Sequence, residues 1–224
     1  VISPLLSNIY LAVLDTVLFN RCSHLGVLVR YAHHFVVPCK TKREVEEAER
    51  RVTHVLTRLG LELHPDKTRK VDLSWGKEGF DFLGCHLRKR LSGPIWEKER
   101  RRVYFLQRWP SHRATRRIRQ RVRELTPRSR CHEDLRDLVA QLNPVLRGWG
   151  NYFRTGNAAV KFNQVDAYVY RRLRSLRRKR AGSRIRAGTA ERWTPDYFVE
   201  GFGLHRLRGT VRYPEAASCR VTRD

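Results

Sequence analysis

The sequence predicts an α+β protein, with short strands and two helices in a first part and an all-helical second part. Three observations support this prediction. Strand-like apolar segments form two hairpin patterns, at residues 28–37 and at residues 79–87. Apolar residues recur at helical spacing in long segments after residue 96. Arginines are concentrated in those same segments, which is typical of helices with one buried and one charged face.

The first predicted elements are a helix and a hairpin. Ser3-Pro4 has the residue types of a helix N-cap and first turn, and apolar residues follow at helical spacing to about Arg21. Apolar segments on both sides of a polar tip then predict a β-hairpin within residues 28–37. His33 and His34 are expected at its tip.

A second helix and further extended structure are expected next. Thr41-Lys42-Arg43-Glu44 has the form of a capping box, in which the threonine and glutamate side chains bind amides at the helix start. The helix that it opens has an apolar face and is expected to stop at Gly60. Extended segments are expected near residues 61–63 and 67–73, before the hairpin at residues 79–87.

The second part is expected to begin near residues 92–96, where Ser-Gly-Pro marks a change in composition. An arginine-rich helical segment with an apolar seam is predicted over residues 97–123, with one break at Pro110. Two further helices are predicted over residues 133–152 and 162–179.

The charge distribution indicates a polyanionic partner. The formal net charge is +25, and residues 96–224 carry +20 of it, with 32 Lys and Arg against 12 Asp and Glu. Arginine supplies 38 of the 47 basic residues, which favours forked contacts with phosphate and stacking on bases. We therefore expect nucleic acid as the partner. No long apolar run or signal peptide indicates a membrane, and nothing in this chain alone indicates a small-molecule substrate.

The cysteines indicate a reducing compartment. The chain contains five, and no pair has the C-x-x-C spacing, so neither a zinc ribbon nor a disulfide framework is expected. A cytoplasmic location is the simplest fit. The residues are Cys22, Cys39, Cys85, Cys131 and Cys219.

The hairpin sequence Tyr31-Ala32-His33-His34 resembles the Tyr-Ala-Asp-Asp hairpin of reverse transcriptases, especially those encoded by bacterial group II introns. The resemblance implies the palm of an RNA-directed DNA polymerase, whose two aspartates hold Mg²⁺ in the family. Here both positions are histidine. Imidazole is a neutral nitrogen ligand that suits Zn²⁺ or Cu²⁺ better than Mg²⁺, and the change removes two negative charges. We therefore expect His33 and His34 to be non-functional catalytic positions that retain no cofactor.

Two other interpretations of these histidines stay open. A recruited transition-metal site would use both as ligands, although no further ligands at suitable spacing accompany them. An error in the recorded sequence is the other interpretation, because each change from aspartate to histidine needs only one altered base. Correcting it would restore the polymerase site.

Three further segments resemble the same family. Residues 61–68 resemble the motif that follows the catalytic hairpin, and residues 80–84, Phe-Asp-Phe-Leu-Gly, resemble the last palm motif near the primer strand. The resemblance gives Lys67 the role of assisting pyrophosphate departure. Residues 1–10 resemble the stretch after the family's Pro-Gln-Gly motif. The chain is thus expected to be the C-terminal portion of a longer protein, without the fingers and the first catalytic aspartate.

Residues 142–153, Leu-Asn-Pro-Val-Leu-Arg-Gly-Trp-Gly-Asn-Tyr-Phe, resemble the core of the maturase domain, or domain X, of group II intron proteins. Residues 192–198 and 203–214 are also similar to such proteins. In the family this domain forms the thumb and binds intron RNA to promote splicing. The resemblance implies the C-terminal part of a reverse-transcriptase palm at residues 1–91, a helical thumb or maturase domain at residues 92–182 and its C-terminal extension at residues 183–224.

The leading hypothesis is an RNA-binding fragment or remnant of a bacterial group II intron reverse transcriptase and maturase, with an inactive polymerase site. Its expected partners are intron RNA and, as a second nucleic acid, DNA. One alternative is an active RNA-directed DNA polymerase whose recorded sequence is truncated and altered at two aspartates. Another is a decayed reading frame whose product does not fold. Whether the chain is an enzyme stays open. The arginines expected to contact RNA are Arg101, Arg102, Arg116, Arg117, Arg119, Arg147, Arg171, Arg172 and Arg178.

Overall fold

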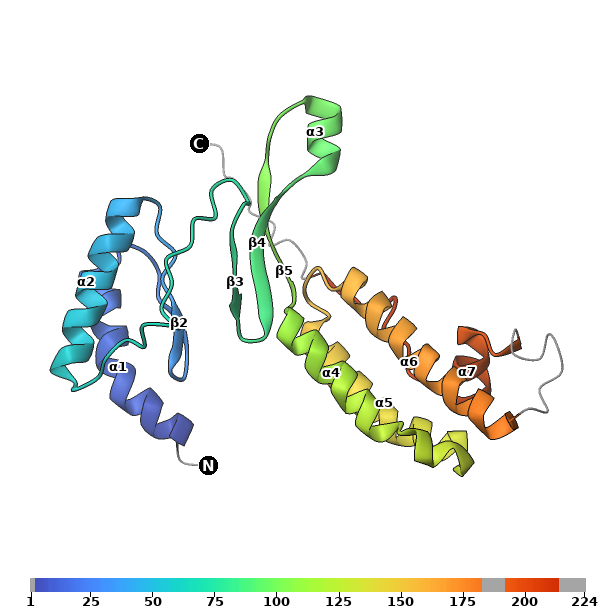
Figure 1. Ribbon diagram of the computed structural model, residues 1–224. Coiled ribbons are helices and arrows are strands. Elements are labelled where there is room, and N and C mark those ends of the chain that lie inside the picture. Colours follow the sequence, from blue (N-terminus) through green and yellow to red (C-terminus); the bar gives the residue numbers. More distant parts are fainter. Residues whose placement is uncertain (1–2, 183–191, 214–224) are drawn as a thin grey trace. The chain divides into compact units, whose positions relative to one another are not determined.

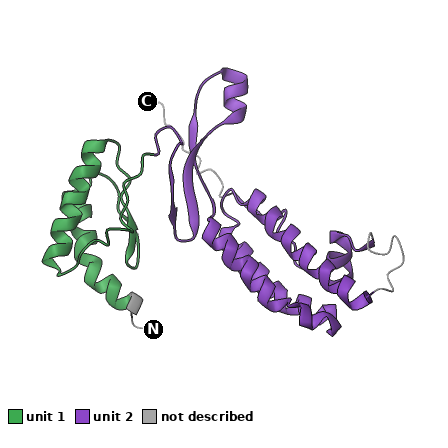
Figure 2. Ribbon diagram, viewed as in Figure 1, with its two compact units in different colours: residues 1–72 green, residues 73–224 purple. Residues whose placement is uncertain are grey.

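The computed structural model describes residues 3–182 and 192–213, whose helices and strands are shown in Figure 1. The chain divides into two compact units, residues 1–72 and residues 73–224 (Figure 2). Helices and two small antiparallel sheets occur together, which agrees with the predicted α+β class. In the described ranges, no helix is both long and apolar enough to cross a membrane.

The first unit packs two helices against a hairpin. Its elements are α1 (Ser3–Arg21), β1 (Val29–Tyr31), β2 (His34–Val36) and α2 (Lys42–Arg58), and the two strands confirm the hairpin predicted in this region. The core comes from both helices and the turn after α1, and consists of Leu11, Leu14, Leu18, Cys22, Leu25, Ala48, Val52, Val55 and Leu56.

The predicted capping box at the start of α2 is confirmed. The Thr41 hydroxyl accepts a hydrogen bond from the Glu44 amide (3.2 Å), and the Glu44 carboxylate accepts one from the Thr41 amide (3.0 Å). Both amides lack a partner within the helix, so the box stabilises its first turn. After the last helical residue, Arg58, the chain reverses at Gly60, whose φ of +68° lies in the left-handed region that favours glycine.

The segments that follow α2 differ from the expectation. Residues 61–63 and 67–73 form no strand and consist of turns and irregular backbone. The hairpin of this unit forms a sheet of two strands only. A strand is stabilised by backbone bonds to a neighbouring strand, and the sequence pattern alone does not reveal whether a neighbour is present.

The second unit begins with a three-stranded antiparallel sheet in the order β3-β4-β5. The strands β3 (Gly79–Phe82) and β4 (Cys85–Leu91) form the second predicted hairpin. A short helix, α3 (Gly93–Glu99), leads to β5 (Tyr104–Pro110), which pairs with β4 along its whole length.

The strand β5 shows that the prediction of helix from residue 97 onward was wrong for residues 104–110, so the second part is not all-helical. The apolar positions 103, 105, 106 and 109 fit a helical seam about as well as a strand. Pairing decides between the two, because β4 supplies backbone partners to every residue of β5. Aromatic residues in this segment also favour a strand. The long arginine-rich helix begins only after Pro110, at His112.

Helices form the rest of the described second unit. They are α4 (His112–Leu125), a short 3₁₀ helix (Arg128–His132), α5 (Leu135–Phe153), α6 (Ala159–Ala181) and α7 (Pro195–Phe202). The helices α5 and α6 confirm the last two predicted helices, and α4 confirms the part of the arginine-rich segment that follows Pro110.

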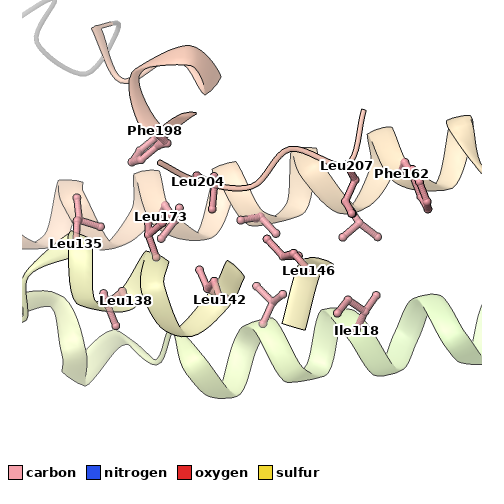
Figure 3. Packing of buried hydrophobic residues seen from close by; sticks show 14 of the residues in the cluster. Ile118, Leu135, Leu138, Leu142, Leu146, Phe162, Leu173, Phe198, Leu204 and Leu207 are labelled. Carbon is pink, nitrogen blue, oxygen red and sulfur yellow. The ribbon is translucent and has the colours of Figure 1, made fainter. Parts of the chain in front are cut away.

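The helices and the segment after α7 share one hydrophobic core (Figure 3). A buried carboxylate binds the backbone beside this core. Asp166 on α6 accepts hydrogen bonds from the amides of Leu207 (3.1 Å) and Arg208 (2.8 Å). Burial raises the pKa of Asp166 although the two amide bonds oppose the rise. These bonds hold the segment after α7 against α6. The labelled core residues include Ile118, Leu138, Leu142, Leu146, Phe162, Leu173, Phe198 and Leu204.

Candidate nucleic-acid interface

The hairpin of the first unit places two histidines at its tip, as predicted. Tyr31 pairs with His34, and Ala32 adopts a left-handed conformation (φ 50°) that closes the turn. Both imidazoles are exposed, and their ring centroids are 4.1 Å apart. The tip therefore presents two adjacent nitrogen ligands to solvent.

Arg30 fixes the hairpin to α1. Its guanidinium forms a two-point ion pair with Asp15, with a distance of 2.7 Å from Nε to Oδ1. It also donates to Asn8 Oδ1 (2.9 Å) and to the Ala32 carbonyl at the turn (2.8 Å). The bond to Asp15 raises the pKa of Arg30. Because the pair links a strand to a helix, it holds the tip in a defined place.

The electrostatics of the tip favour the neutral form of His34. Desolvation lowers the pKa of His34, and the positive charges of His33 and Lys67 lower it further. Lys67 is thus close enough for its charge to act on His34, while a shared catalytic role of these residues stays a prediction. The two imidazoles provide no anionic oxygen and do not fit Mg²⁺. In the part of the chain that the structure describes, no group of three or more His, Cys, Asp and Glu could hold a metal ion.

The predicted RNA-binding arginines lie on several elements of the second unit. Arg101 and Arg102 follow α3 in an irregular segment and are exposed. Arg101 forms a loose ion pair with Glu99 (3.7 Å), and Arg102 lies over the ring of Trp96, 5.5 Å from its centroid. Both guanidinium groups remain accessible to a ligand.

Two of the predicted arginines connect α4 to α6. Arg119 on α4 is half-buried and lies over the ring of Tyr168, 5.7 Å from its centroid. Arg172 on α6 is half-buried and donates to Thr126 at the end of α4, including a bond of 3.1 Å to its hydroxyl. These contacts stabilise the helix pair, so both side chains have a structural role in addition to any contact with a ligand.

Other predicted arginines are exposed. Arg116 and Arg117 lie on α4 and Arg178 lies on α6, and none of the three side chains has a hydrogen-bond or ion-pair partner among residues 3–182 and 192–213. Arg171 donates only to the Ala167 carbonyl of its own helix (3.3 Å). Arg147 on α5 is also exposed. Unpaired exposed guanidinium groups on packed helices are suited to contact phosphate.

Four basic residues of the second unit that were not predicted from the sequence as site residues lie around one groove. Arg88, Lys89 and Arg90 belong to β4, and Lys161 belongs to the first turn of α6. A signal was present, because Arg88 and Arg90 alternate with other residues as the outward positions of a strand do. The expectation of helix for residues 97–123 hid the strand that completes this surface.

The comparisons with known proteins bear on the helices of the second unit. Residues 115–193 match the group II intron, maturase-specific domain. This maturase-specific segment begins within α4, includes α5 and α6, and contains seven of the nine predicted arginines. A search of curated proteins gave no match. The match confirms the resemblance of residues 142–153, while the resemblance of the first part to a reverse-transcriptase palm and the three domain ranges stay predictions.

Proposed function

We propose that this chain binds group II intron RNA through its maturase-specific segment, and that it is a fragment or remnant of an intron-encoded reverse transcriptase and maturase. The observation that carries the proposal is the match at residues 115–193. A maturase-specific domain implies a function related to group II intron maturases and RNA splicing. The described part of this segment contains most of α4 and all of α5 and α6, which are rich in arginine.

The physical chemistry of these helices supports RNA as the ligand. Their apolar faces pack in the shared core, which leaves the exposed arginines outside the core and open to a ligand. Residues 96–224 carry a net charge of +20, and such a charge produces self-repulsion that a polyanion relieves. RNA offers phosphates at many positions along a folded surface, and forked guanidinium groups suit them.

We further propose that the hairpin tip supports no polymerase chemistry. Two-metal nucleotidyl transfer needs carboxylate ligands for Mg²⁺, and positions 33 and 34 offer imidazole instead. The positive charge of Lys67, which acts on His34, also opposes the approach of a cation. Primer extension by this chain in the presence of Mg²⁺ would contradict this part of the proposal.

The proposal is tested by removing exposed charges from the maturase-specific segment. The variant Arg116→Gln/Arg117→Gln/Arg178→Gln is expected to bind structured intron RNA about 30- to 100-fold more weakly, because three lost contacts of about 0.7 to 0.9 kcal/mol each sum to about 2 to 2.7 kcal/mol. Its salt dependence is expected to be shallower by about one unit of slope for each phosphate contact that is lost. Fluorescence anisotropy with labelled RNA measures both quantities.

The matched control removes the same charge from the first unit. Arg43, Arg58 and Arg69 are exposed there, and none has a side-chain partner among the described residues. Their triple change to glutamine is expected to weaken binding by less than about threefold. Equal losses in the two triple variants would show that net charge, and not the helical surface, determines binding.

A further inference from the structure

Basic and aromatic side chains share one face of the β4–β5 ladder. In the antiparallel register Arg88 lies opposite Gln107, His86 opposite Trp109 and Arg90 opposite Phe105. Cross-strand partners point to the same face of a sheet, as do alternate residues along a strand. Arg88, Arg90, Gln107 and Trp109 therefore lie on one face. The guanidinium of Arg90 lies 5.8 Å from the ring centroid of Trp109.

The loop between α5 and α6 brings the start of α6 to this sheet. The Asn157 amide donates to the Arg108 carbonyl (2.7 Å), and the Arg108 side chain donates to the Thr155 hydroxyl (2.7 Å). Gly156 allows this approach, because a Cβ atom there would lie 2.7 Å from the Arg108 carbonyl oxygen. The sheet and the first turn of α6 are thus held together within the second unit.

A groove of about 730 Å³ lies between these elements. Among the described residues, its lining contains four basic residues, three aromatic residues and two amides, with no carboxylate, and includes Arg88, Lys89, Arg90, Lys161, Tyr104, Trp109, Tyr213, Gln107 and Asn157. A smaller groove of about 250 Å³ shares Gln107, Asn157 and Tyr213 with it. The two therefore adjoin along β5.

Several of the lining side chains are available to a ligand. Tyr213 is 64% exposed. Lys161 has no hydrogen-bond or ion-pair partner in the described part of the chain, and Arg90 contacts only the ring of Trp109. Arg88, by contrast, donates to the Gly76 carbonyl (2.7 Å) and holds the loop before β3 against the sheet. Arg90, Lys161 and Tyr213 can thus be changed without loss of an observed polar contact.

We propose that this groove binds an unpaired segment of RNA, with its phosphates on Arg90 and Lys161 and a base against Tyr213 or Trp109. The proposal rests on the proposed RNA-binding function. It adds a second site, most of whose lining residues lie outside the maturase-specific segment, residues 115–193. Cations without carboxylates suit a phosphate backbone, and aromatic rings suit bases that are not stacked in a helix. The volume lies in the range of about 300–1,000 Å³ that is usual for ligand sites.

The mixture of lining residues distinguishes an unpaired strand from other polyanions. The bases of double-stranded RNA are stacked on one another, and such RNA is recognised mainly through its shape, phosphates and 2′-hydroxyl groups. An acidic peptide would pair its carboxylates with the basic side chains. It would offer no planar bases to the aromatic and amide side chains of the lining. Arginine, aromatic and amide side chains together can contact the phosphates, the faces and the edges of exposed bases.

The experiment compares a labelled oligouridine of roughly 8 nucleotides with a fully paired RNA stem, by fluorescence anisotropy with the whole chain. For the oligouridine, Arg90→Gln/Lys161→Gln is expected to weaken binding about tenfold and to reduce the salt slope by about 1.4. Tyr213→Leu is expected to weaken it about tenfold with the salt slope unchanged, because stacking involves no counterion. Binding of the stem is expected to change less than about twofold in both variants.

The controls carry matched changes outside the groove. Arg208→Gln/Lys98→Gln removes one arginine and one lysine that are exposed in the same unit, and Phe19→Leu removes an aromatic side chain that is 80% exposed. Both are expected to bind the oligouridine as the unchanged chain does. Groove variants with full affinity, or with equal losses for the oligouridine and the stem, would overturn the groove proposal. Failure of the unchanged chain to bind any RNA would overturn the proposed function as well.

Discussion

The affinity of this protein for structured RNA is expected to fall by about 10³- to 10⁵-fold between roughly 50 and 200 mM salt. This range applies to a protein that neutralises roughly 6–10 phosphates, because each neutralised phosphate releases condensed counterions. The exposed arginines of α4, α5 and α6, together with the basic groove, are sufficient for that number of contacts. A titration of labelled RNA at a series of salt concentrations gives the slope directly.

The salt titration has an internal control. The Arg116→Gln/Arg117→Gln/Arg178→Gln variant is expected to show a slope smaller by about 3 than that of the unchanged chain. An affinity that is weak and nearly independent of salt would contradict the electrostatic basis of the interface. It would leave the +20 charge of residues 96–224 without a ligand that explains it.

The second large effect is expected from Phe162→Ala, which should destabilise the helical unit by about 4 kcal/mol. Phe162 is fully buried in the core of α4, α5 and α6, and its ring centroid lies 5.5 Å from that of Trp149. Removing the ring leaves a cavity among helices that other contacts already hold in place. Val160→Ala on the same helix is the control, because Val160 is 66% exposed and should change stability by less than about 0.5 kcal/mol.

Tryptophan fluorescence reports the unfolding of the second unit alone, and so measures the loss of stability caused by Phe162→Ala. The five tryptophans are residues 75, 96, 109, 149 and 193, and all of them lie in the second unit. Urea unfolding followed by this signal should show one cooperative transition, shifted to lower urea in Phe162→Ala. A broad, non-cooperative transition in the unchanged chain would instead support the interpretation as a decayed reading frame whose product does not fold.

Elements that depend only on residues close together in the chain could be predicted from the sequence. The capping box at Thr41, the hairpin tip at His33 and His34, and the helices α5 and α6 depend on residues close together in the chain. The strand β5 could not be predicted in this way. Its apolar spacing fits both periods, and its conformation depends on pairing with β4, a separate segment.

The roles of individual arginines were equally hidden, for the same reason. Arg172 lies beside Arg171 in the sequence, yet Arg172 bonds to Thr126, 46 residues away, while Arg171 bonds to the Ala167 carbonyl of its own helix. Arg119 contacts Tyr168 on another helix. Such contacts depend on how helices pack, so a sequence identifies a basic face without separating side chains that hold the fold from those that contact a ligand.

The central claim, that the helical unit is an intron-RNA-binding maturase segment, is tested most directly by competition. Labelled group II intron RNA is bound to the whole chain at near-physiological salt. Unlabelled intron RNA and an unrelated structured RNA of equal length are then compared as competitors. We predict that the intron RNA competes at least about tenfold more effectively, because the proposed maturase function requires recognition of intron shape in addition to phosphate. Equal competition by the two RNAs would show that the surface binds phosphate alone and would contradict the maturase function.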